Sequence, residues 1–350
     1  MLFRRNSWNG TSRAPAAGRC RLALLSACLG AGASLLAQQP PPDTHTLRVD
    51  VQLVNVDVTV VDAQGRFVPD LAARHFRLRE DGAPQAVTHF LPTHAPIRIA
   101  LLVEASPAVF LIRYDHLAAA YFLLAGLRPD DEAALVTYAR APRPELGFTR
   151  DKAEVERQLD RRGQFGLGMA DVRLLDAVAQ TLDWLSPPPA RTAVVVIGTG
   201  LDSGSRTDWA ALEQRIGSSQ VTFFAVATGR LLRAEPEEKG KKKPRDTSLD
   251  AAFDEADARL RALAAASAGE AYFPESADDL ERIYGEIAER LRNVYSLGYY
   301  PTNRARDAAY RRITVELTDE SGAPLILRDP GGRPAAPRVF ARPGYFAPRE

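Results

Sequence analysis

The sequence predicts an α/β fold whose main domain is a doubly wound, mostly parallel sheet. Four short runs have the continuous apolar character of strands buried on both faces of such a sheet, and they cover residues 97–103, 133–138, 193–197 and 221–227. Helical spacing of apolar residues marks the segments between them, at 114–127, 152–159, 173–185 and 208–216. Such an alternation specifies right-handed crossovers around an open sheet.

Two β-rich segments flank this domain. Residues 47–94 begin with alternating apolar and polar residues and continue with short strand-like runs between turn signals, which predicts a small antiparallel β module. Residues 296–350 contain further strand-like runs, separated by Gly-containing turns. We expect this C-terminal β extension to pack on the main domain or to pair with the N-terminal β module.

The doubly wound domain is expected to span residues 95–295. A charged segment with Gly and Pro, 229–246, interrupts its pattern and predicts a surface loop. Two long helices, 249–268 and 277–295, are predicted after it, with a short strand between them at 271–273.

The first 37 residues have the composition of an export signal. Five arginines and no acidic residue accompany an apolar, small-residue run that ends at Ala37, so cleavage is expected after Ala33 or Ala37. Two alternatives are an uncleaved anchor, although the run is shorter than the ~20 residues of a spanning helix, and lipid attachment at Cys28. A Pro-rich linker, 38–46, follows. We therefore expect a secreted, periplasmic or cell-surface protein.

Composition excludes several classes of function. A chain of 350 residues with 45% hydrophobic and 25% charged residues is an ordinary globular protein. Both cysteines, Cys20 and Cys28, lie in the leader, so the mature chain has no thiol chemistry. Removing the five leader arginines changes the formal net charge from +1 to about −4. Because the basic cluster at 239–245 follows three glutamates, it indicates a solvated loop, and nucleic acid is not an expected partner.

No catalytic constellation is apparent. The segment Ser203-Gly204-Ser205 is not a nucleophile elbow, and no histidine follows His116. The run 198–204 has the wrong glycine spacing for a dinucleotide loop and lies late in the sheet. A two-carboxylate hydrolase stays open as an alternative, with the candidate acids and bases Asp171, Asp176 and Asp202.

Histidines and tyrosines are the remaining candidates for ligands or contact residues. Scattered surface positions are predicted for all five histidines, His45, His75, His89, His94 and His116. A zinc site would lack further ligands at suitable spacing. The C-terminal tyrosines form either a contact surface or strand-face packing; they are Tyr295, Tyr299, Tyr300, Tyr310 and Tyr345.

The turn after the first strand of the parallel sheet carries a resemblance to a known family. Its sequence, Glu104-Ala105-Ser106-Pro107-Ala108, resembles the D-x-S-x-S turn that holds a divalent cation in von Willebrand factor A domains. Residues 47–348 as a whole resemble bacterial VWFA-related proteins, which have a β module with an E-D-G turn, an A-type domain and a C-terminal L-G-Y-x-P segment. The matching motifs are 56–66, 76–82, 297–303 and 342–348.

The resemblance implies a metal site with five ligand positions, of which this chain keeps one. The implied positions are Glu104, Ser106, Ala108, Val172 and Thr199. Only Ser106 matches the family's residue, because a glutamate replaces the first aspartate and Thr199 replaces the last. Alanine and valine offer no side-chain oxygen. We therefore expect a degenerate site without metal or other cofactor, and Mg²⁺ or Mn²⁺ binding only if Asp171 or Asp202 rebuilds it.

Together these features predict a non-enzymatic binding or scaffolding protein of the cell envelope. It would act through the strand-end face of the A-type domain, in metal-independent protein–protein interaction or adhesion. The partner is expected to be a protein or another envelope component, with membrane contact only through an uncleaved signal or a lipidated Cys28. The alternatives are the carboxylate-dependent hydrolase and a structural subunit of an envelope assembly.

Overall fold

The structure is a computed structural model, and its described part begins after the predicted leader and linker. It covers residues 53–94, 96–162, 171–186, 192–233, 247–276, 278–329 and 331–349. The predicted export signal, the Pro-rich linker and Cys28 lie outside the described residues.

A six-stranded sheet forms the centre of the predicted A-type domain. Its order is β10-β9-β8-β5-β6-β7, and every neighbouring pair is parallel except β6 and β7. The strands are β5 (Arg98–Glu104), β6 (Glu132–Tyr138), β7 (Pro142–Thr149), β8 (Thr192–Gly198), β9 (Thr222–Ala227) and β10 (Ala271–Tyr272). All seven residues of β8 are buried, which explains why the central strands are continuously apolar.

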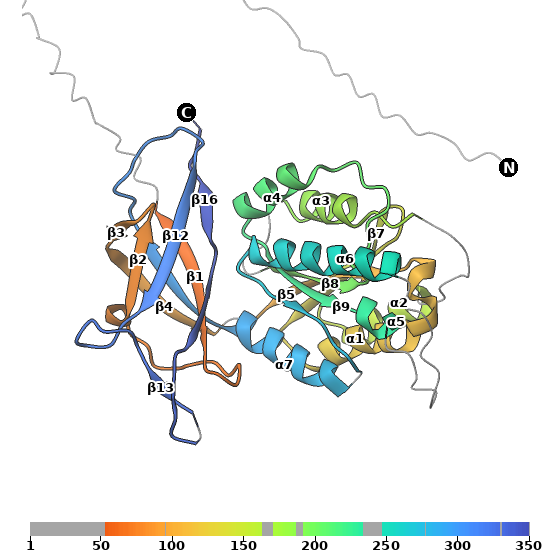
Figure 1. Cartoon of the computed structure of the whole chain (residues 1–350), viewed down its shortest axis with the longest axis horizontal. Coiled ribbons are helices and arrows are strands. Elements are labelled where there is room, and N and C mark those ends of the chain that lie inside the picture. The colour runs from red at the N-terminus through yellow and green to blue at the C-terminus, as the bar shows by residue number, and fades with distance from the viewer. Residues whose placement is uncertain are drawn as a thin grey trace, which may run out of the picture. The chain divides into compact units, whose positions relative to one another are not determined.

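Helices cover both faces of this sheet (Figure 1). One face packs against α3 (Leu174–Trp184), α4 (Trp209–Ser218) and α6 (Thr247–Ala265). The other packs against α1 (Arg113–Ala125), α2 (Lys152–Arg162) and α7 (Asp278–Arg292). Along β5, Ala100 and Leu102 enter the first core, while Ile99 and Leu101 enter the second. The predicted doubly wound α/β fold is confirmed.

The two β-rich ends of the chain form one β-sandwich. One sheet has the order β15-β1-β11-β4 and the other β16-β12-β2-β3. The strands are β1 (Val54–Val61), β2 (Phe76–Glu80), β3 (Ala83–Gln85), β4 (Val87–His94), β11 (Asn293–Tyr299), β12 (Tyr310–Leu317), β15 (Arg338–Ala341) and β16 (Gly344–Phe346). A separate hairpin joins β13 (Leu327–Arg328) and β14 (Pro334–Ala335).

The expected pairing of the C-terminal strands with the N-terminal module is observed in both sheets. Strand β1 pairs with β11, with Val56 opposite Leu297, and β2 pairs with β12, with Leu78 opposite Val315. Since α7 is followed directly by β11, the chain re-enters the sandwich without an intervening loop. The A-type domain is therefore inserted in sequence between two halves of the sandwich.

The predicted helix 277–295 is wrong at its C-terminal end. Helix α7 ends at Arg292, and the next residue begins β11. Tyr295 is buried in the sandwich core, where it stacks on Phe67 and Phe90. The helical pattern of the preceding residues continues into this segment, but packing inside the sandwich makes it a strand.

The predicted surface loop 229–246 is wrong for its first five residues. They form the short helix α5 (Gly229–Arg233), whose Leu231 and Leu232 pack against η2 (Pro107–Ile112), a 3₁₀ helix. Residues 234–246 lie outside the described part of the chain. A second 3₁₀ helix, η1 (Ala73–His75), precedes β2.

Strand β7 has no counterpart among the predicted elements. Its two prolines, Pro142 and Pro144, argue against a strand because proline cannot donate a ladder hydrogen bond. They are tolerated here because β7 is the edge strand of the sheet and pairs only with β6.

Candidate functional site

The carboxyl ends of three parallel strands bring two of the implied metal positions, Glu104 and Thr199, together with Tyr138. Glu104 ends β5, Tyr138 ends β6 directly beside it in register, and Thr199 follows β8. A side chain at Gly198 would collide with the Tyr138 hydroxyl and with the Glu104 carboxyl. The tight packing at Gly198 shows that this space is filled by the carboxyl and the phenol.

Glu104 uses both carboxyl oxygens in hydrogen bonds within the protein. Its Oε1 accepts a bond from Ser106 Oγ at 2.5 Å. Its Oε2 accepts one from the Thr199 backbone N–H at 2.6 Å and one from Thr199 Oγ1 at 2.8 Å. The longer glutamate side chain thus reaches across to the third loop and bonds the residue that stands at the family's aspartate position. Glu104 joins the two loops directly.

This cluster is closed to solvent. Glu104, Ser106 and Thr199 are each 0% exposed. Burial, opposed by the hydrogen bonds from Ser106 and Thr199, raises the pKa of Glu104. Burial and the neighbouring Glu104 raise the pKa of Tyr138 well above its usual range. A cation entering here would have to break the hydrogen bonds that hold the loops.

His116 is part of the same closed region, so the predicted surface position is wrong for this residue. It is fully buried on α1, where Nε2 donates to the Glu104 carbonyl at 2.9 Å and Nδ1 accepts from Thr228 Oγ1 at 3.0 Å; these roles are assigned from the network. Burial lowers the pKa of His116 to about 4, against the effect of the bond to Glu104.

Among the residues that the structure describes, the other histidines form no metal site. His89 is exposed and His75 is half-buried, whereas His45 and the side chain of His94 lie outside what the structure describes. No group of three or more His, Cys, Asp or Glu side chains suited to a metal occurs among the described residues.

The second-loop position and its neighbour do not reach Glu104. Val172 is buried. Its backbone N–H donates to Ser203 Oγ at 2.9 Å, and the Ser203 backbone N–H donates to the Val172 carbonyl at 2.8 Å. Asp171 is 48% exposed and pairs with Arg140 at 3.7 Å and Arg173 at 3.6 Å. Asp171 therefore has surface partners, while Val172 fastens the second loop to the third.

Asp176 and Asp202 anchor the third loop to the start of α3. Asp202 Oδ1 accepts from Ser205 Oγ at 2.5 Å and from the Leu175 N–H at 3.4 Å. Asp176 accepts from the Thr207 N–H and hydroxyl and from the Arg206 N–H. Partial burial opposes these bonds, but the bonds prevail and lower the pKa of Asp176. Loop anchoring accounts for both carboxylates.

An exposed apolar patch borders this closed cluster. It consists of Leu111 and Tyr114, which are exposed, and of Phe110 and Arg113, which are half-buried, on η2 and the first turn of α1; we call it the rim patch. Leu111 is 81% exposed and Tyr114 is 73% exposed. The Arg113 guanidinium carbon lies 5.0 Å from the Phe110 ring centroid and 4.3 Å from that of Tyr114. The cation therefore holds the two rings in place at the strand-end face.

Sequence reasoning missed Tyr138, His116 and the rim patch. Tyr138 was within reach, because it is the last residue of a predicted strand whose end lies at this face. His116 lies three and four residues before the buried Ala119 and Ala120, so helical spacing places it on the inner face of α1. Nothing in the local sequence pattern predicts that Leu111 is exposed.

The strand order defines the class of the main domain. Five parallel strands with one antiparallel edge strand, in the order β10-β9-β8-β5-β6-β7, are the arrangement of a von Willebrand factor A-type domain. The chain therefore contains a domain with this fold.

Comparison with known proteins finds similar solved structures at low sequence identity. No family model and no curated protein matches the sequence. An aerotolerance-related membrane protein from Bacteroides fragilis is 15% identical, with 55% of this chain and 98% of that chain covered and a TM-score of 0.37. BatB from Bacteroides thetaiotaomicron is 14% identical, with 55% and 98% covered and a TM-score of 0.38. A von Willebrand factor type A protein from Catenulispora acidiphila is 11% identical, with 84% and 74% covered and a TM-score of 0.42.

Proposed function

We propose that this chain is an exported, non-enzymatic protein-binding module of the cell envelope whose A-type domain engages its partner without a metal ion. The observation that carries the proposal is the closed state of the strand-end cluster. The carboxyl group of Glu104 is fully buried and bonded on both oxygens to Ser106 and Thr199. A partner therefore meets the surface around this cluster rather than an ion within it.

Coordination chemistry supports the metal-independent form. Magnesium prefers six oxygens in near-octahedral geometry, with one or two protein carboxylates among them. Here the single carboxylate at the implied positions is Glu104, which serves as the acceptor that fixes Thr199. Burial raises the pKa of Glu104, and this disfavours metal binding because a carboxyl group must be deprotonated to bind a cation.

The rim patch supplies a contact surface of suitable composition. Large aromatic side chains and arginine dominate the binding energy of protein interfaces. Leu111 on η2 and Tyr114 on α1 are three residues apart in the sequence. Arg113 holds Tyr114 by a cation–π contact and a 3.1 Å hydrogen bond to its hydroxyl. Such preorganised rings lose little freedom on binding.

The segment that carries the rim patch also packs into the domain core. Residues Pro107–Ala125 are long and apolar enough for a membrane span by length and composition alone. Ala119, Ala120 and Leu123 of this segment are fully buried against the sheet. Its apolar character is therefore explained by the core on one side and by the rim patch on the other.

The non-enzymatic part of the proposal is supported by the roles of the candidate carboxylates. Asp176 and Asp202 accept hydrogen bonds from loop and helix groups, and Asp171 pairs with two arginines. A general acid or base needs a free position facing a substrate. These contacts favour anchoring over catalysis.

The test combines capture and calorimetry on the mature chain. The chain is immobilised, and solubilised envelopes of the source cells are passed over it in EDTA and again in Mg²⁺. We expect equal capture in both buffers, loss of capture by at least about tenfold with Leu111→Asp, and no loss with Ile326→Asp. Ile326 is a matched control because it is also a large exposed aliphatic residue but belongs to the sandwich region.

Two results would contradict the proposal. One is capture that EDTA abolishes. The other is saturable Mg²⁺ or Mn²⁺ binding in calorimetry below about 1 mM that Glu104→Ala removes, since it would mean that Asp171 or Asp202 rebuilds the site.

A further inference from the structure

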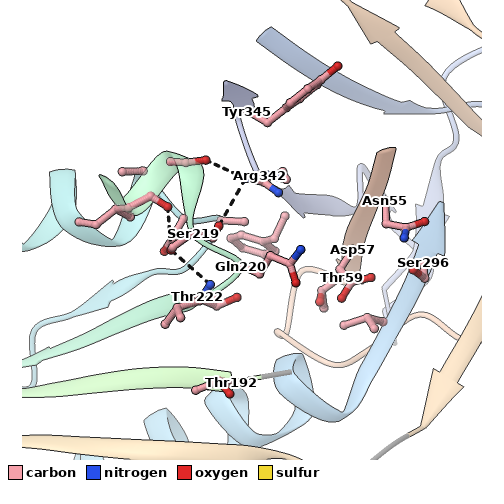
Figure 2. A pocket seen from close by; sticks show the side chains of 18 of the residues that line it. Asn55, Asp57, Thr59, Thr192, Ser219, Gln220, Thr222, Ser296, Arg342 and Tyr345 are labelled. Atoms are coloured by element: carbon pink, nitrogen blue, oxygen red, sulfur yellow. Dashed lines mark hydrogen bonds between the residues drawn. The ribbon is translucent and has the colours of Figure 1, made fainter. Parts of the chain in front are cut away.

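A cleft with solvent-accessible polar walls lies between the β-sandwich and the A-type domain. Its volume is about 620 Å³, within the range of small-molecule sites. Figure 2 shows Asn55, Asp57 and Ser296 of the sandwich on one side and Ser219, Gln220 and Thr222 of the A-type domain on the other. It is separate from the rim patch, whose residues do not line it.

Arg342 holds the two walls of this cleft together. Its Nε donates to the Gly344 carbonyl at 2.9 Å, and its Nη2 donates to the Gly217 carbonyl at the end of α4 at 2.7 Å. These bonds connect the β15–β16 turn to the A-type domain. Its Nη1 has no hydrogen-bond partner in the part of the chain that the structure describes, so it stays available to a ligand.

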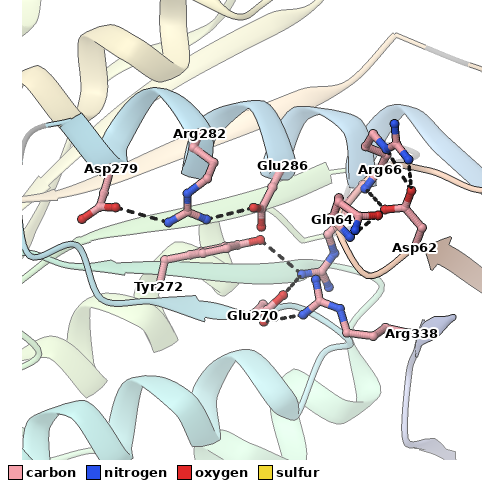
Figure 3. A network of polar contacts seen from close by, with 10 residues as sticks. Asp62, Gln64, Arg66, Glu270, Tyr272, Asp279, Arg282, Glu286 and Arg338 are labelled. Carbon is pink, nitrogen blue, oxygen red and sulfur yellow. Dashed lines mark hydrogen bonds and ion pairs between the residues drawn. The ribbon is translucent and has the colours of Figure 1, made fainter. Parts of the chain in front are cut away.

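A second set of contacts supports the base of the cleft. Arg290 of α7 pairs with Glu270 at 2.7 Å and lies 3.6 Å from the Phe340 ring centroid of β15. Arg338 of β15 reaches the same Glu270 at 3.6 Å (Figure 3). Thr59 Oγ1 donates to the Arg290 carbonyl at 3.0 Å. These contacts between β1, β15 and α7 fix the walls of the cleft before a ligand binds.

Four polar side chains of the cleft wall have no bonding role in the fold. Within the described residues, no side-chain hydrogen bond or ion pair engages Asn55, Asp57, Gln220 or Ser296. Asp57 and Ser296 are direct partners across β1 and β11, so their side chains leave the same face of the sheet. The cleft thus presents a carboxylate, two amides and a hydroxyl, groups that together both donate and accept hydrogen bonds.

Charge and shape restrict the ligand. Asp57 opposes a phosphate or carboxylate, whereas Arg342 and Arg290 oppose a cation, because all three line the same cleft. The half-buried rings of Phe340 and Phe346 add an apolar part to the wall. A neutral molecule with many hydroxyl groups and an apolar C–H face fits this combination of planar polar groups and aromatic rings.

We propose that this cleft binds a neutral carbohydrate of one or two sugar units, with Asn55, Asp57 and Gln220 bonded to its hydroxyl groups. The inference does not depend on the rim patch or on the metal-free strand-end cluster.

Saturation-transfer NMR and calorimetry on the mature chain test it. The neutral probes are cellobiose, maltose and N,N′-diacetylchitobiose, and the charged probes are glucose 6-phosphate, glucuronic acid and glucosamine. We expect saturable binding of at least one neutral disaccharide below about 10 mM and weaker binding of every charged sugar. Asp57→Ala and Gln220→Ala should each weaken it at least about fivefold.

Two control variants make the result specific. Glu316→Ala alters an exposed carboxylate on β12, in the other sheet of the sandwich, and should leave sugar binding unchanged. Leu111→Asp should also leave it unchanged, so that this proposal and the proposed protein-binding function fail separately. The carbohydrate proposal is overturned if no neutral probe binds, if a charged sugar binds more tightly, or if the Asp57 and Gln220 variants bind as the original chain does.

Discussion

Two buried glutamates, one in each part of the molecule, differ in how many of their carboxyl oxygens accept hydrogen bonds. Glu104 of the A-type domain bonds Ser106 and Thr199 through both carboxyl oxygens. Glu80 of the sandwich accepts two bonds on Oε2, from Tyr299 at 2.6 Å and Tyr345 at 2.9 Å, and its Oε1 has no hydrogen-bond partner among the described residues. One carboxyl is fully engaged and the other is half engaged.

Around Glu80, motifs that carry the family resemblance hold the fold together. Glu80 belongs to the E-D-G turn, Tyr299 to the L-G-Y segment and Tyr345 to the P-G-Y-F segment, so three motifs that carry the resemblance meet at one buried point. They join β2 with β11 and β16, strands from both sheets of the sandwich. At Glu104, which stands at an implied metal position, the carboxyl instead bonds the two neighbouring loops to each other.

The largest effect is expected from removing the fully engaged carboxyl. Glu104→Ala leaves three buried donors of Ser106 and Thr199 without an acceptor and opens a cavity, so the free energy of unfolding should fall by about 3–5 kcal/mol. Glu104→Gln keeps the shape and one acceptor, and should cost about 1–2 kcal/mol. Urea denaturation at pH 7 measures both. Equal, small losses would mean that Glu104 does not hold the loops.

The neutral, buried His116 should make stability depend on pH. Its folded pKa of about 4 lies below the unfolded value of 6.5, so the unfolded state binds the proton more readily. The stabilisation is complete above pH 6.5 and is lost as the pH falls towards 4, by about 3 kcal/mol in total. Urea denaturation between pH 4 and 7 measures this slope, and His116→Gln should flatten it.

Glu104 affects the same dependence of folding stability on pH, but in the opposite direction. Because its folded pKa is raised, the folded state retains the proton longer, and its contribution decreases as the pH rises above the unfolded value of 4.5. The His116 slope should therefore be steeper in Glu104→Gln than in the original chain. An unchanged slope would argue against the raised pKa of Glu104.

A smaller effect is expected at the sandwich carboxyl. Tyr299→Phe and Tyr345→Phe each remove one bond to Glu80 and should each cost about 1–2 kcal/mol, because the other hydroxyl still bonds Oε2. The double variant leaves the buried carboxyl without a hydrogen bond from either tyrosine and should cost more than the two losses added together, by about 1 kcal/mol. A double-mutant cycle by urea denaturation measures this coupling, and additive losses would show that the two tyrosines act independently.

The smallest expected effect is that of a divalent cation. A site with a dissociation constant near 1 mM would add about 1.4 kcal/mol of stability in 10 mM Mg²⁺. We expect no change in the unfolding temperature between 10 mM Mg²⁺ and EDTA, because Glu104 is already bonded on both oxygens. A rise in Mg²⁺ that Asp202→Ala removes would make this region a cation site after all.

The sequence by itself determined the parallel strands of the sheet and the long helices that cover them. Buried parallel strands are continuously apolar, and amphipathic helices repeat every 3.6 residues, so both leave a local signal. The sequence likewise shows that Ala108 and Val172, at two of the metal positions that the resemblance implies, carry no side-chain oxygen. The end of α7 at Arg292 was missed, because local periodicity does not report the packing that begins at the next residue.

Only the tertiary structure decided how the buried polar groups are partnered. Glu104 meets Thr199 across 95 residues and Glu80 meets Tyr345 across 265, and no local period links such positions. The burial of His116, the exposure of Leu111 and the cleft beside Asp57 depend in the same way on which elements pack together. Burial determines the pKa of a group and its access to a ligand, and burial is a property of the assembled fold.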